Sequence, residues 1–306
     1  MKSTTVRRVT LSIAVVTALT GLAACGTEKT GKAGGESLAH VSPVAALRSA
    51  EKSTGKALSA KVRSTTTIGN AMSMNMDGRF AWGAGMRGDV TITYTGGKLA
   101  DAMRQMGTAS TEARYLPDAC YTKMSGKLTQ QMGGKHWLRY GYDDLAKFGG
   151  GSGSYMKDQM QNATPNQTVK MTLASGDVKK VGEEKVSGVQ TAHYSGTVSV
   201  ADLAGKNSNL GAGQLADLKK QLKQAGITTE TVDLWINDQD LPVKSVTKAD
   251  MATGLMSSTV YYTDYGVKVS VQQPPASDTR DFKDLMKSLG ASGSGNVATG
   301  SATSSS

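Results

Sequence analysis

Residues 72–95 read MSMNMDGRFAWGAGMRGDVTITYT and contain two runs in which apolar and polar side chains alternate. Six apolar residues occupy the alternating positions: Met72, Met74, Met76, Val90, Ile92 and Tyr94. A period of two residues is typical of strands with one face in a core and the other in solvent. The stretch therefore predicts two neighbouring strands, Met72–Trp82 and Met86–Thr95, in a half-solvated antiparallel sheet.

Further strands and helices are predicted along the rest of the chain. Further strands are predicted at Lys61–Ile68, Ala113–Met124, His136–Tyr140, Val178–Val186, Val189–Val200, Thr229–Ile236, Leu241–Asp250, Leu255–Thr263 and Val267–Val271. Helices are predicted at Val44–Thr54, Leu99–Met106, Asp143–Phe148, Tyr155–Gln161, Val169–Leu173 and Gln214–Gln224. Ser42 and Pro43 can cap and begin the first helix, and Gly55 can end it. Strands joined by tight turns, with helices inserted in blocks, favour an α+β fold with a large antiparallel sheet.

The N-terminus has the composition of an export signal. A cationic start, Met1–Arg8, precedes the apolar run Val9–Ala24, which is shorter than the roughly 20 apolar residues that span a bilayer comfortably. The run closes in Leu22-Ala23-Ala24-Cys25, which resembles the bacterial lipobox, in which the cysteine is acylated before cleavage. We interpret residues 1–24 as a lipoprotein signal peptide and Cys25 as the lipidation site. An ordinary secretory signal cut before an unmodified Cys25 is the alternative.

Composition divides the remaining chain into three parts. Residues 25–39 are polar and glycine-rich, which predicts a flexible tether. Residues 290–306 are a Gly, Ser, Ala and Thr run that cannot bury enough apolar surface to order itself, so a disordered tail is expected. Residues 40–289 are then left as a single domain.

The charge balance limits the partners that we expect. The chain has 35 Lys and Arg against 25 Asp and Glu. This modest surplus fits a soluble surface, or attraction to anionic lipid headgroups or acidic wall polymers. Because the chain carries an export signal and no basic–aromatic cluster, a nucleic-acid partner is not expected. We expect a monomer at the outer face of the cell membrane, held there by its lipid anchor.

The residues that carry chemistry are few and scattered. The three histidines, His40, His136 and His193, have no metal-ligand spacing, and the paired carboxylates lie beside turns, where acidic residues are common. No serine-nucleophile motif stands in a convincing context. Cys120 has no partner for a disulfide if Cys25 is acylated, and it is interpreted as a small buried apolar residue. We therefore predict no enzyme activity, no metal and no cofactor.

Methionine supplies much of the apolar volume. Met72, Met74 and Met76 project from one face of a strand, and Met103 and Met106 belong to the following helix. Methionines most often fill irregular gaps in a core. They can also form a deformable lining for a hydrophobic ligand. Both interpretations remain open.

A family resemblance comes from the second half of the chain. Residues 174–194 resemble a strand pair of exported lipoproteins of the LppX/LprG type. They include Asp177-Val178, the Ser187-Gly188 turn and His193-Tyr194. Residues 232–244, with Trp235 and the Leu241-Pro242 return strand, look like the next strand pair of the same group. The match covers about residues 177–265.

This resemblance implies a LolA-like fold, in which a strongly curved antiparallel sheet, a half-barrel, is wrapped around helices and encloses an apolar cavity. It also implies that the cavity binds or carries a lipid or another hydrophobic ligand by its acyl chains. The residues expected to line the cavity are Met72, Met74, Met76, Val90, Ile92, Tyr94, Met103, Met106, Leu234 and Ile236. The alternative function is a tethered cell-surface interaction module that binds a protein or wall polymer and has no ligand cavity.

Overall fold

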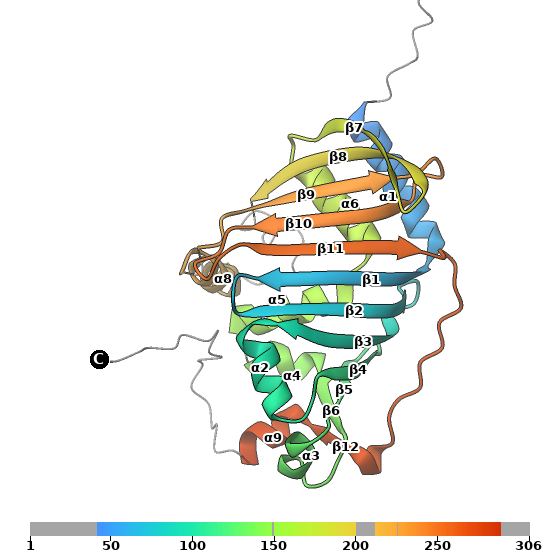
Figure 1. Ribbon diagram of the computed structural model, residues 1–306. Helices are drawn as coiled ribbons and strands as arrows, with labels where there is room; N and C mark the ends of the chain where they lie inside the picture. The colour runs from blue at the N-terminus through green and yellow to red at the C-terminus, as the bar shows by residue number, and fades with distance from the viewer. Residues whose placement is uncertain (1–41, 149, 200–211, 225, 289–306) are drawn as a thin grey trace, which may run out of the picture. The chain divides into compact units, whose positions relative to one another are not determined.

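The computed structural model describes residues 42–148, 150–199, 212–224 and 226–288 (Figure 1). The predicted signal peptide (1–24), Cys25, the tether (25–39) and the tail (290–306) lie outside the described residues.

The described strands form one sheet of twelve in the order β12-β6-β5-β4-β3-β2-β1-β11-β10-β9-β8-β7. Their bounds are β1 Ser59–Ile68, β2 Met72–Ala81, β3 Arg87–Gly96, β4 Ser110–Tyr115, β5 Ala119–Lys123, β6 Trp137–Gly141, β7 Lys179–Val186, β8 Val189–Ser199, β9 Thr229–Ile236, β10 Pro242–Ala249, β11 Met256–Thr263 and β12 Thr279–Asp281. Neighbouring strands are antiparallel except for β12, which pairs with β6 in parallel. The expected α+β fold with a large antiparallel sheet is confirmed, and β7 and β12 leave the sheet open at its two edges.

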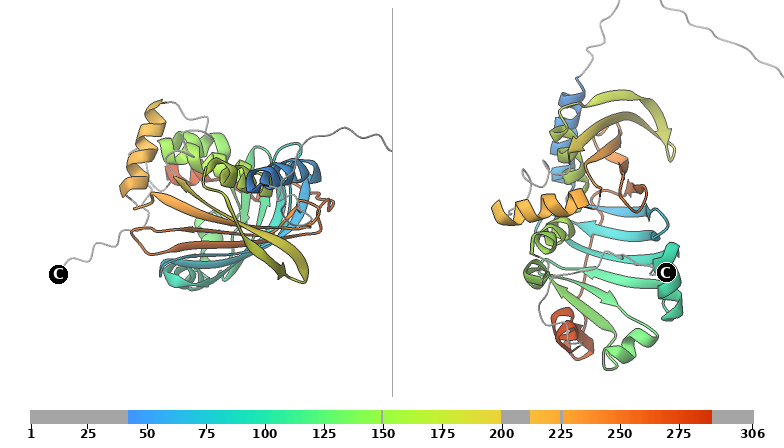
Figure 2. Two further views of the ribbon diagram at one scale, coloured as in Figure 1. Left: turned by 90° about the horizontal axis from the view of Figure 1, so that it is seen from above. Right: turned by 90° about the vertical axis from the view of Figure 1, so that its left-hand side faces the viewer.

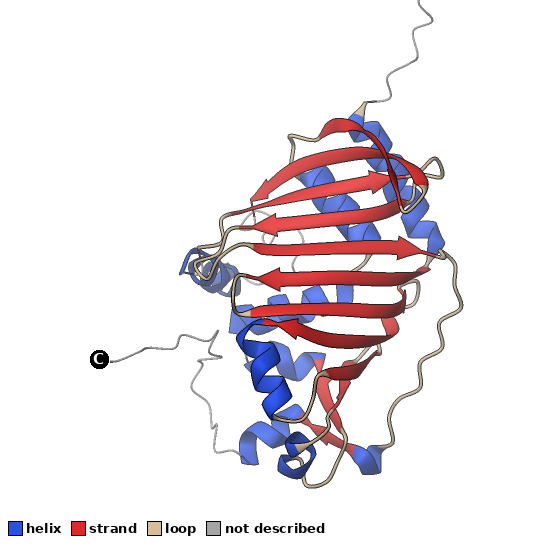
Figure 3. Ribbon diagram, viewed as in Figure 1, coloured by secondary structure: helices blue, strands red, loops and turns tan. Residues whose placement is uncertain are grey.

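Most of the described helices lie on one side of the sheet (Figures 2 and 3). The helices are α1 Pro43–Ala57, α2 Gly97–Gln105, α3 Lys127–Gln131, α4 Tyr142–Phe148, α5 Gly150–Asn162, α6 Pro165–Ala174, α8 Ala212–Gln224 and α9 Phe282–Ser288, with a 3-10 turn at Ala276–Asp278. α1 packs on α6, and α6 contacts β8 and β9. α2 contacts β2 and β3 from the opposite side of the sheet (Figure 2).

The first helix forms where its caps predict. The Ser42 hydroxyl accepts a hydrogen bond from the Ala45 amide at 3.2 Å, and Pro43 takes the first helical position. The predicted stop at Gly55 is wrong, because α1 continues to Ala57 and ends where Leu58 adopts a left-handed conformation with φ of 59°.

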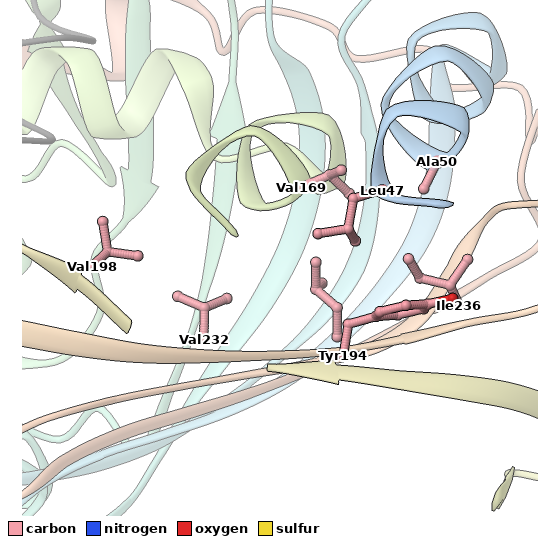
Figure 4. Close-up of a cluster of buried hydrophobic side chains, with 8 residues drawn as sticks. Leu47, Ala50, Val169, Tyr194, Val198, Val232 and Ile236 are labelled. Carbon is pink, nitrogen blue, oxygen red and sulfur yellow. The ribbon is translucent and has the colours of Figure 1, made fainter. Parts of the chain in front are cut away.

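Two clusters of buried side chains lie between the sheet and the helices. The first joins Leu47 and Ala50 of α1 and Val169 of α6 to five residues of β8 and β9: Tyr194, Val198, Val232, Leu234 and Ile236 (Figure 4). The second gathers on the other half of the sheet around Val62, Phe80, Met86, Val90, Ala113 and Tyr262. These clusters fix which face of the sheet points inward.

Three further sequence expectations need correction. The predicted strand Ala113–Met124 is two strands, because Leu116-Pro117-Asp118 makes a turn closed by a hydrogen bond from the Leu116 amide to the Ala119 carbonyl at 2.9 Å. Val267–Val271 forms no strand and instead begins a long connection to β12 (Figure 1). The glycine-rich segment before Tyr155 belongs to α5. The elements α3, β12 and α9 were not expected at all.

Candidate functional site

The face of the sheet that α1 and α6 cover, called here the inner face, can be followed across eight strands. Residues directly opposite each other in an antiparallel pair point to the same face. One such row consists of Tyr194, Leu234, Ser245, Val260, Ser64, Met76, Ile92 and Thr111, from β8 to β4. Because Tyr194 and Leu234 lie in the cluster under α1, the whole row belongs to the inner face.

Eight of the ten residues predicted to line a cavity share this face. They are Met72, Met74, Met76, Val90, Ile92, Tyr94, Leu234 and Ile236. Met103 of α2 and Met106 at its C-terminal cap are not brought to the others, since α2 lies on the opposite side of the sheet (Figure 2).

Helices cover the two halves of the inner face unequally. Leu234 and Ile236 are buried beneath α1 and α6, and Val90 is buried in the second cluster. Met72, Met74 and Tyr94, by contrast, are only partly buried, although they point to the same side as the helices. The β2–β3 half therefore keeps accessible apolar surface.

A strip of small hydroxyl side chains separates the two halves. Its members lie on three adjacent strands, β10, β11 and β1: Ser245, Thr247, Ser258, Ser64 and Thr66. The Thr66 and Ser258 hydroxyls are 3.0 Å apart and satisfy each other. This strip was not predicted from the sequence. The sequence feature that could have revealed it is the presence of serine and threonine at the inward positions of predicted strands, where bulky residues are usual.

A pocket of about 330 Å³ lies at one end of the inner face. It is bounded by the end of α1, the turn between β2 and β3, and the connection between α5 and α6. Leu58, Trp82 and Met86 form its apolar wall, and Met86 also belongs to the second buried cluster. Its volume is at the lower end of the range of about 300 to 1,000 Å³ that is usual for small-molecule sites.

The polar wall of the pocket comes mainly from amide side chains and one cation: Gln161, Asn162, Asn166, Gln167 and Lys170. The Asn166 amide donates to the Glu51 carbonyl at 2.6 Å and to the Thr54 hydroxyl at 3.1 Å, which ties α6 to the last turns of α1. The Trp82 indole donates to the Thr54 carbonyl at 3.3 Å. Such a wall offers uncharged donors and acceptors to a polar group.

Burial shifts the pKa values of several titratable groups on the inner face in the direction that favours their neutral forms. Burial raises the pKa of the Cys120 thiol to about 12 and also raises the pKa of the neighbouring Tyr115 hydroxyl. Desolvation raises the pKa of the Glu230 carboxyl, which stands opposite Val198 on the inner face. Cys120 is 3 % exposed, so the expectation of a small buried residue is confirmed. A neutral thiol is a poor nucleophile at neutral pH.

The two described histidines pair with carboxylates. His193 Nε2 is 3.0 Å from Asp233 Oδ1, and its ring stacks on Trp235 with the centroids 4.1 Å apart. His136 Nδ1 is 2.8 Å from Asp278 Oδ1. Within the described ranges, no group of three or more His, Cys, Asp or Glu residues is arranged to hold a metal ion. Nor does any described helix have the length and apolar character needed to cross a membrane.

A scan against protein-family models finds no match. The chain is 53% identical over 255 residues to an uncharacterized 31.2 kDa protein of the rplA–rplJ intergenic region of Streptomyces griseus, covering 83% of this chain and 84% of the relative. It is 41% identical over 314 residues to SCO4650 of Streptomyces coelicolor, a protein named as a candidate lipoprotein, covering 95% of this chain and all of the relative.

Among solved structures, two mycobacterial proteins each overlay with a TM-score of 0.45. LppX, a lipoprotein of Mycobacterium tuberculosis, is 14% identical and covers 75% of this chain and 98% of its own. LprF of Mycobacterium bovis is 15% identical and covers 76% of this chain and 96% of its own. A LolA superfamily protein of Nitrosomonas europaea overlays with a TM-score of 0.26 at 10% identity.

The fold and the inner face together define an α+β protein whose one open sheet carries an apolar face under a helix layer. The chain belongs to the same protein family as the two Streptomyces relatives.

Proposed function

We propose that this protein is exported, is anchored to the outer face of the membrane through a lipid on Cys25, and binds or carries a lipid by its acyl chains. The anchor is supported by the lipobox-like residues that end in Cys25 and by the relative named as a candidate lipoprotein. The single domain expected over residues 40–289 would carry the binding site.

The observation that carries the ligand proposal is the accessible apolar surface on the inner face. Met72, Met74 and Tyr94 face the helix layer without being fully covered by it. Next to them, the small side chains of Ser64, Thr66 and Ser258 leave more room between sheet and helices than leucines would. An acyl chain along this surface gains about 0.8 kcal/mol for each CH₂ group that it buries.

The pocket beside α1 would hold the polar end of the lipid. Its apolar wall joins the second buried cluster through Met86, so a chain that lies in the interior can end there. Its amide side chains can donate to and accept from an ester or hydroxyl headgroup. This division between an apolar body and a few polar groups is usual for small-molecule sites.

The ligand proposal is tested with the chain from Gly26 onward, which lacks the acylation site. This part is suitable because all of the described residues belong to one compact unit. We expect mass spectrometry of organic extracts to find co-purified lipid, and a fluorescent fatty acid to bind. Met74→Trp, which fills the inner face, should weaken binding at least about tenfold, since it displaces several methylene groups. Asn75→Trp, on the other face of the same strand, is the matched control and should bind as the wild type does.

A protein that yields no lipid and does not bind the fatty acid contradicts the ligand proposal. It would then be better described as a tethered interaction module. Equal loss of binding in both tryptophan variants would place the ligand elsewhere.

The anchor is tested separately with the full chain. Cys25→Ser should remove the chain from the membrane fraction and abolish labelling by a palmitate analogue. A Cys25→Ser protein that stays in the membrane and is still labelled would overturn the anchor but leave the ligand proposal untouched.

A further inference from the structure

Helix α1 has two faces of opposite character. Leu47, Ala50 and Thr54 are fully buried against the sheet and α6. On the opposite side, Arg48, Lys52 and Lys56 are exposed. Their spacing of four residues places them one above the next along the helix. We call these three residues the basic ridge.

None of the three cations of the basic ridge forms an ion pair within the part of the chain that the structure describes. One carboxylate, that of Asp240, reaches α1 at Ser49, the residue after Arg48, whose hydroxyl donates a hydrogen bond to it. Glu51, the one acidic residue of α1, instead pairs with Lys170 at 3.9 Å. By contrast, several cations on the outer face of the sheet are paired with acids, as Arg63 is with Asp77 at 3.0 Å and Arg79 with Asp89 at 2.9 Å. The ridge therefore presents a net positive surface.

Exposed apolar side chains flank the ridge at both ends. Val44 is 43 % exposed at its start and Leu58 is 50 % exposed at its end. Cations interspersed with exposed apolar side chains are the combination with which peripheral helices bind the headgroup region of anionic membranes. Leu58 also lines the pocket described above, so the ridge ends at the edge of that pocket.

The ridge lies close to the proposed anchor in sequence. Residues 26–42 separate Cys25 from α1. Even fully extended, at about 3.4 Å per residue, this segment spans only about 58 Å. An anchored chain therefore keeps α1 within reach of the membrane, so that attraction to headgroups, which acts over about 10 Å, is felt whenever α1 approaches the surface.

We infer that the basic ridge is a docking surface for an anionic lipid bilayer, which sets the edge of the pocket against the membrane. The inference rests on the proposed function for the presence of the membrane. It does not require that the pocket or the inner face bind a lipid.

A second group of exposed lysines provides a matched control. Lys219, Lys220 and Lys223 lie on α8, which projects from the helix layer (Figure 2). Reversing these three charges changes the net charge by as much as reversing the ridge does. General attraction between a basic protein and an anionic surface would respond equally to both changes.

The experiment measures binding of residues 26–306 to vesicles by flotation. The vesicles contain either phosphatidylcholine alone or phosphatidylcholine with phosphatidylglycerol. The wild type should bind only the anionic vesicles, and less tightly as salt is added. Arg48→Glu with Lys52→Glu and Lys56→Glu should weaken binding about a hundredfold, because each cation near the surface contributes several-fold. The α8 triple variant, Lys219→Glu with Lys220→Glu and Lys223→Glu, should weaken binding by less than about threefold.

Folding of the ridge variant is checked by circular dichroism. The milder variant Arg48→Gln, Lys52→Gln and Lys56→Gln keeps good helix formers and should still lose most of the binding. The inference would be overturned if the wild-type protein did not bind anionic vesicles, or if the ridge and α8 variants lost vesicle binding to the same extent. Fatty-acid binding measured without vesicles separates the two proposals. A chain that binds vesicles but not the fatty acid contradicts only the ligand proposal. A chain that binds the fatty acid but not the vesicles contradicts only the proposed docking of the ridge to the membrane.

Discussion

Cys120 lies on β5 and is only 3 % exposed, and burial raises the pKa of its thiol from 9.0 to about 12. The thiolate is the reactive form, so the folded protein should resist thiol reagents well above neutral pH. In residues 26–306 this is the only cysteine, which makes the measurement direct. We expect a disulfide reagent at about pH 8 to label the denatured chain rapidly and the native chain at least about a hundredfold more slowly. Equal labelling rates would show that Cys120 is accessible in the folded protein.

Gly88 on β3 stands directly opposite Phe80 on β2. A Cβ at this position would lie 2.2 Å from the Phe80 ring and 2.8 Å from the Arg79 carbonyl oxygen. Phe80 would have to leave its edge-to-face contact with Tyr115, where the ring centroids are 5.2 Å apart. Gly88→Ala should therefore lower the free energy of unfolding by about 1–3 kcal/mol, as overpacking of a core usually does.

Denaturant unfolding measures this loss, with Gly182→Ala as the control. Gly182 also lies in a strand, but a Cβ there meets no atom within 4 Å. Its replacement should change stability by no more than about 0.5 kcal/mol. Comparable losses at the two positions would mean that Phe80 does not fill the space above Gly88.

At the scale of the element, α1 is held by its buried face. Leu47 is fully buried in the cluster with Val169 and Leu234, whereas Val44, one turn earlier, is 43 % exposed. Leu47→Ala should cost about 2–5 kcal/mol of unfolding free energy because it leaves a cavity. Val44→Ala should cost less than about 0.5 kcal/mol. Thermal unfolding of the two variants compares them on one helix, and similar losses would contradict the packing described for α1.

The elements that the sequence predicted best are those with a regular period. The alternation in residues 72–95 predicts β2 and β3 because each strand has one inward and one outward face. It could not predict β12, whose three residues are too few to show a period. It also overlooked Pro117, which cannot donate a backbone hydrogen bond and stands in the turn that separates β4 from β5.

The start of α5 differs from the prediction for another reason. The predicted helix begins only at Tyr155, but α5 includes Gly153, where a Cβ would lie 2.1 Å from the Leu145 carbonyl oxygen of α4. Glycine is needed at this position so that two helices can approach closely, and tertiary packing overrides its low helix propensity. The residues around Gly153 in the sequence do not reveal this contact between two helices, so it could not be predicted.

At the scale of the whole molecule, the register decides which predicted site residues come together. Alternation placed Met72, Met74 and Met76 on one face of β2, but it could not show that Leu234 shares that face. That relation depends on β1, which joins β2 to β11 and so brings the two halves of the chain into one sheet. Met103 and Met106 were grouped with the others by composition alone. In the structure these two methionines are separated from the other eight residues, because α2 lies on the opposite side of the sheet from the inner face.

Burial of acidic hydroxyl and thiol groups also makes the whole fold sensitive to alkali. Burial raises the pKa of Cys120 to about 12 and raises the pKa values of Tyr115, Tyr262 and Tyr265 above the usual 10.0. Between the unfolded and folded pKa values, the unfolded chain releases protons that the folded chain retains. The unfolded state therefore binds fewer protons, and stability falls as the pH rises. The contribution of these groups is complete below about pH 9 and is progressively lost above it.

We therefore expect the free energy of unfolding to decline steadily from about pH 9 upward and tyrosinate absorbance to rise together with unfolding. Tyr262→Phe provides the sharpest check. Its hydroxyl is buried in the second cluster, where it lies 3.4 Å from the Ser245 hydroxyl and also interacts with the Thr168 side chain. The variant removes one group that the unfolded chain can ionise, and its stability should decline less steeply above about pH 10. If the free energy of unfolding declined with pH at the same slope in the variant and the wild type, Tyr262 would ionise as readily in the folded protein as in the unfolded chain.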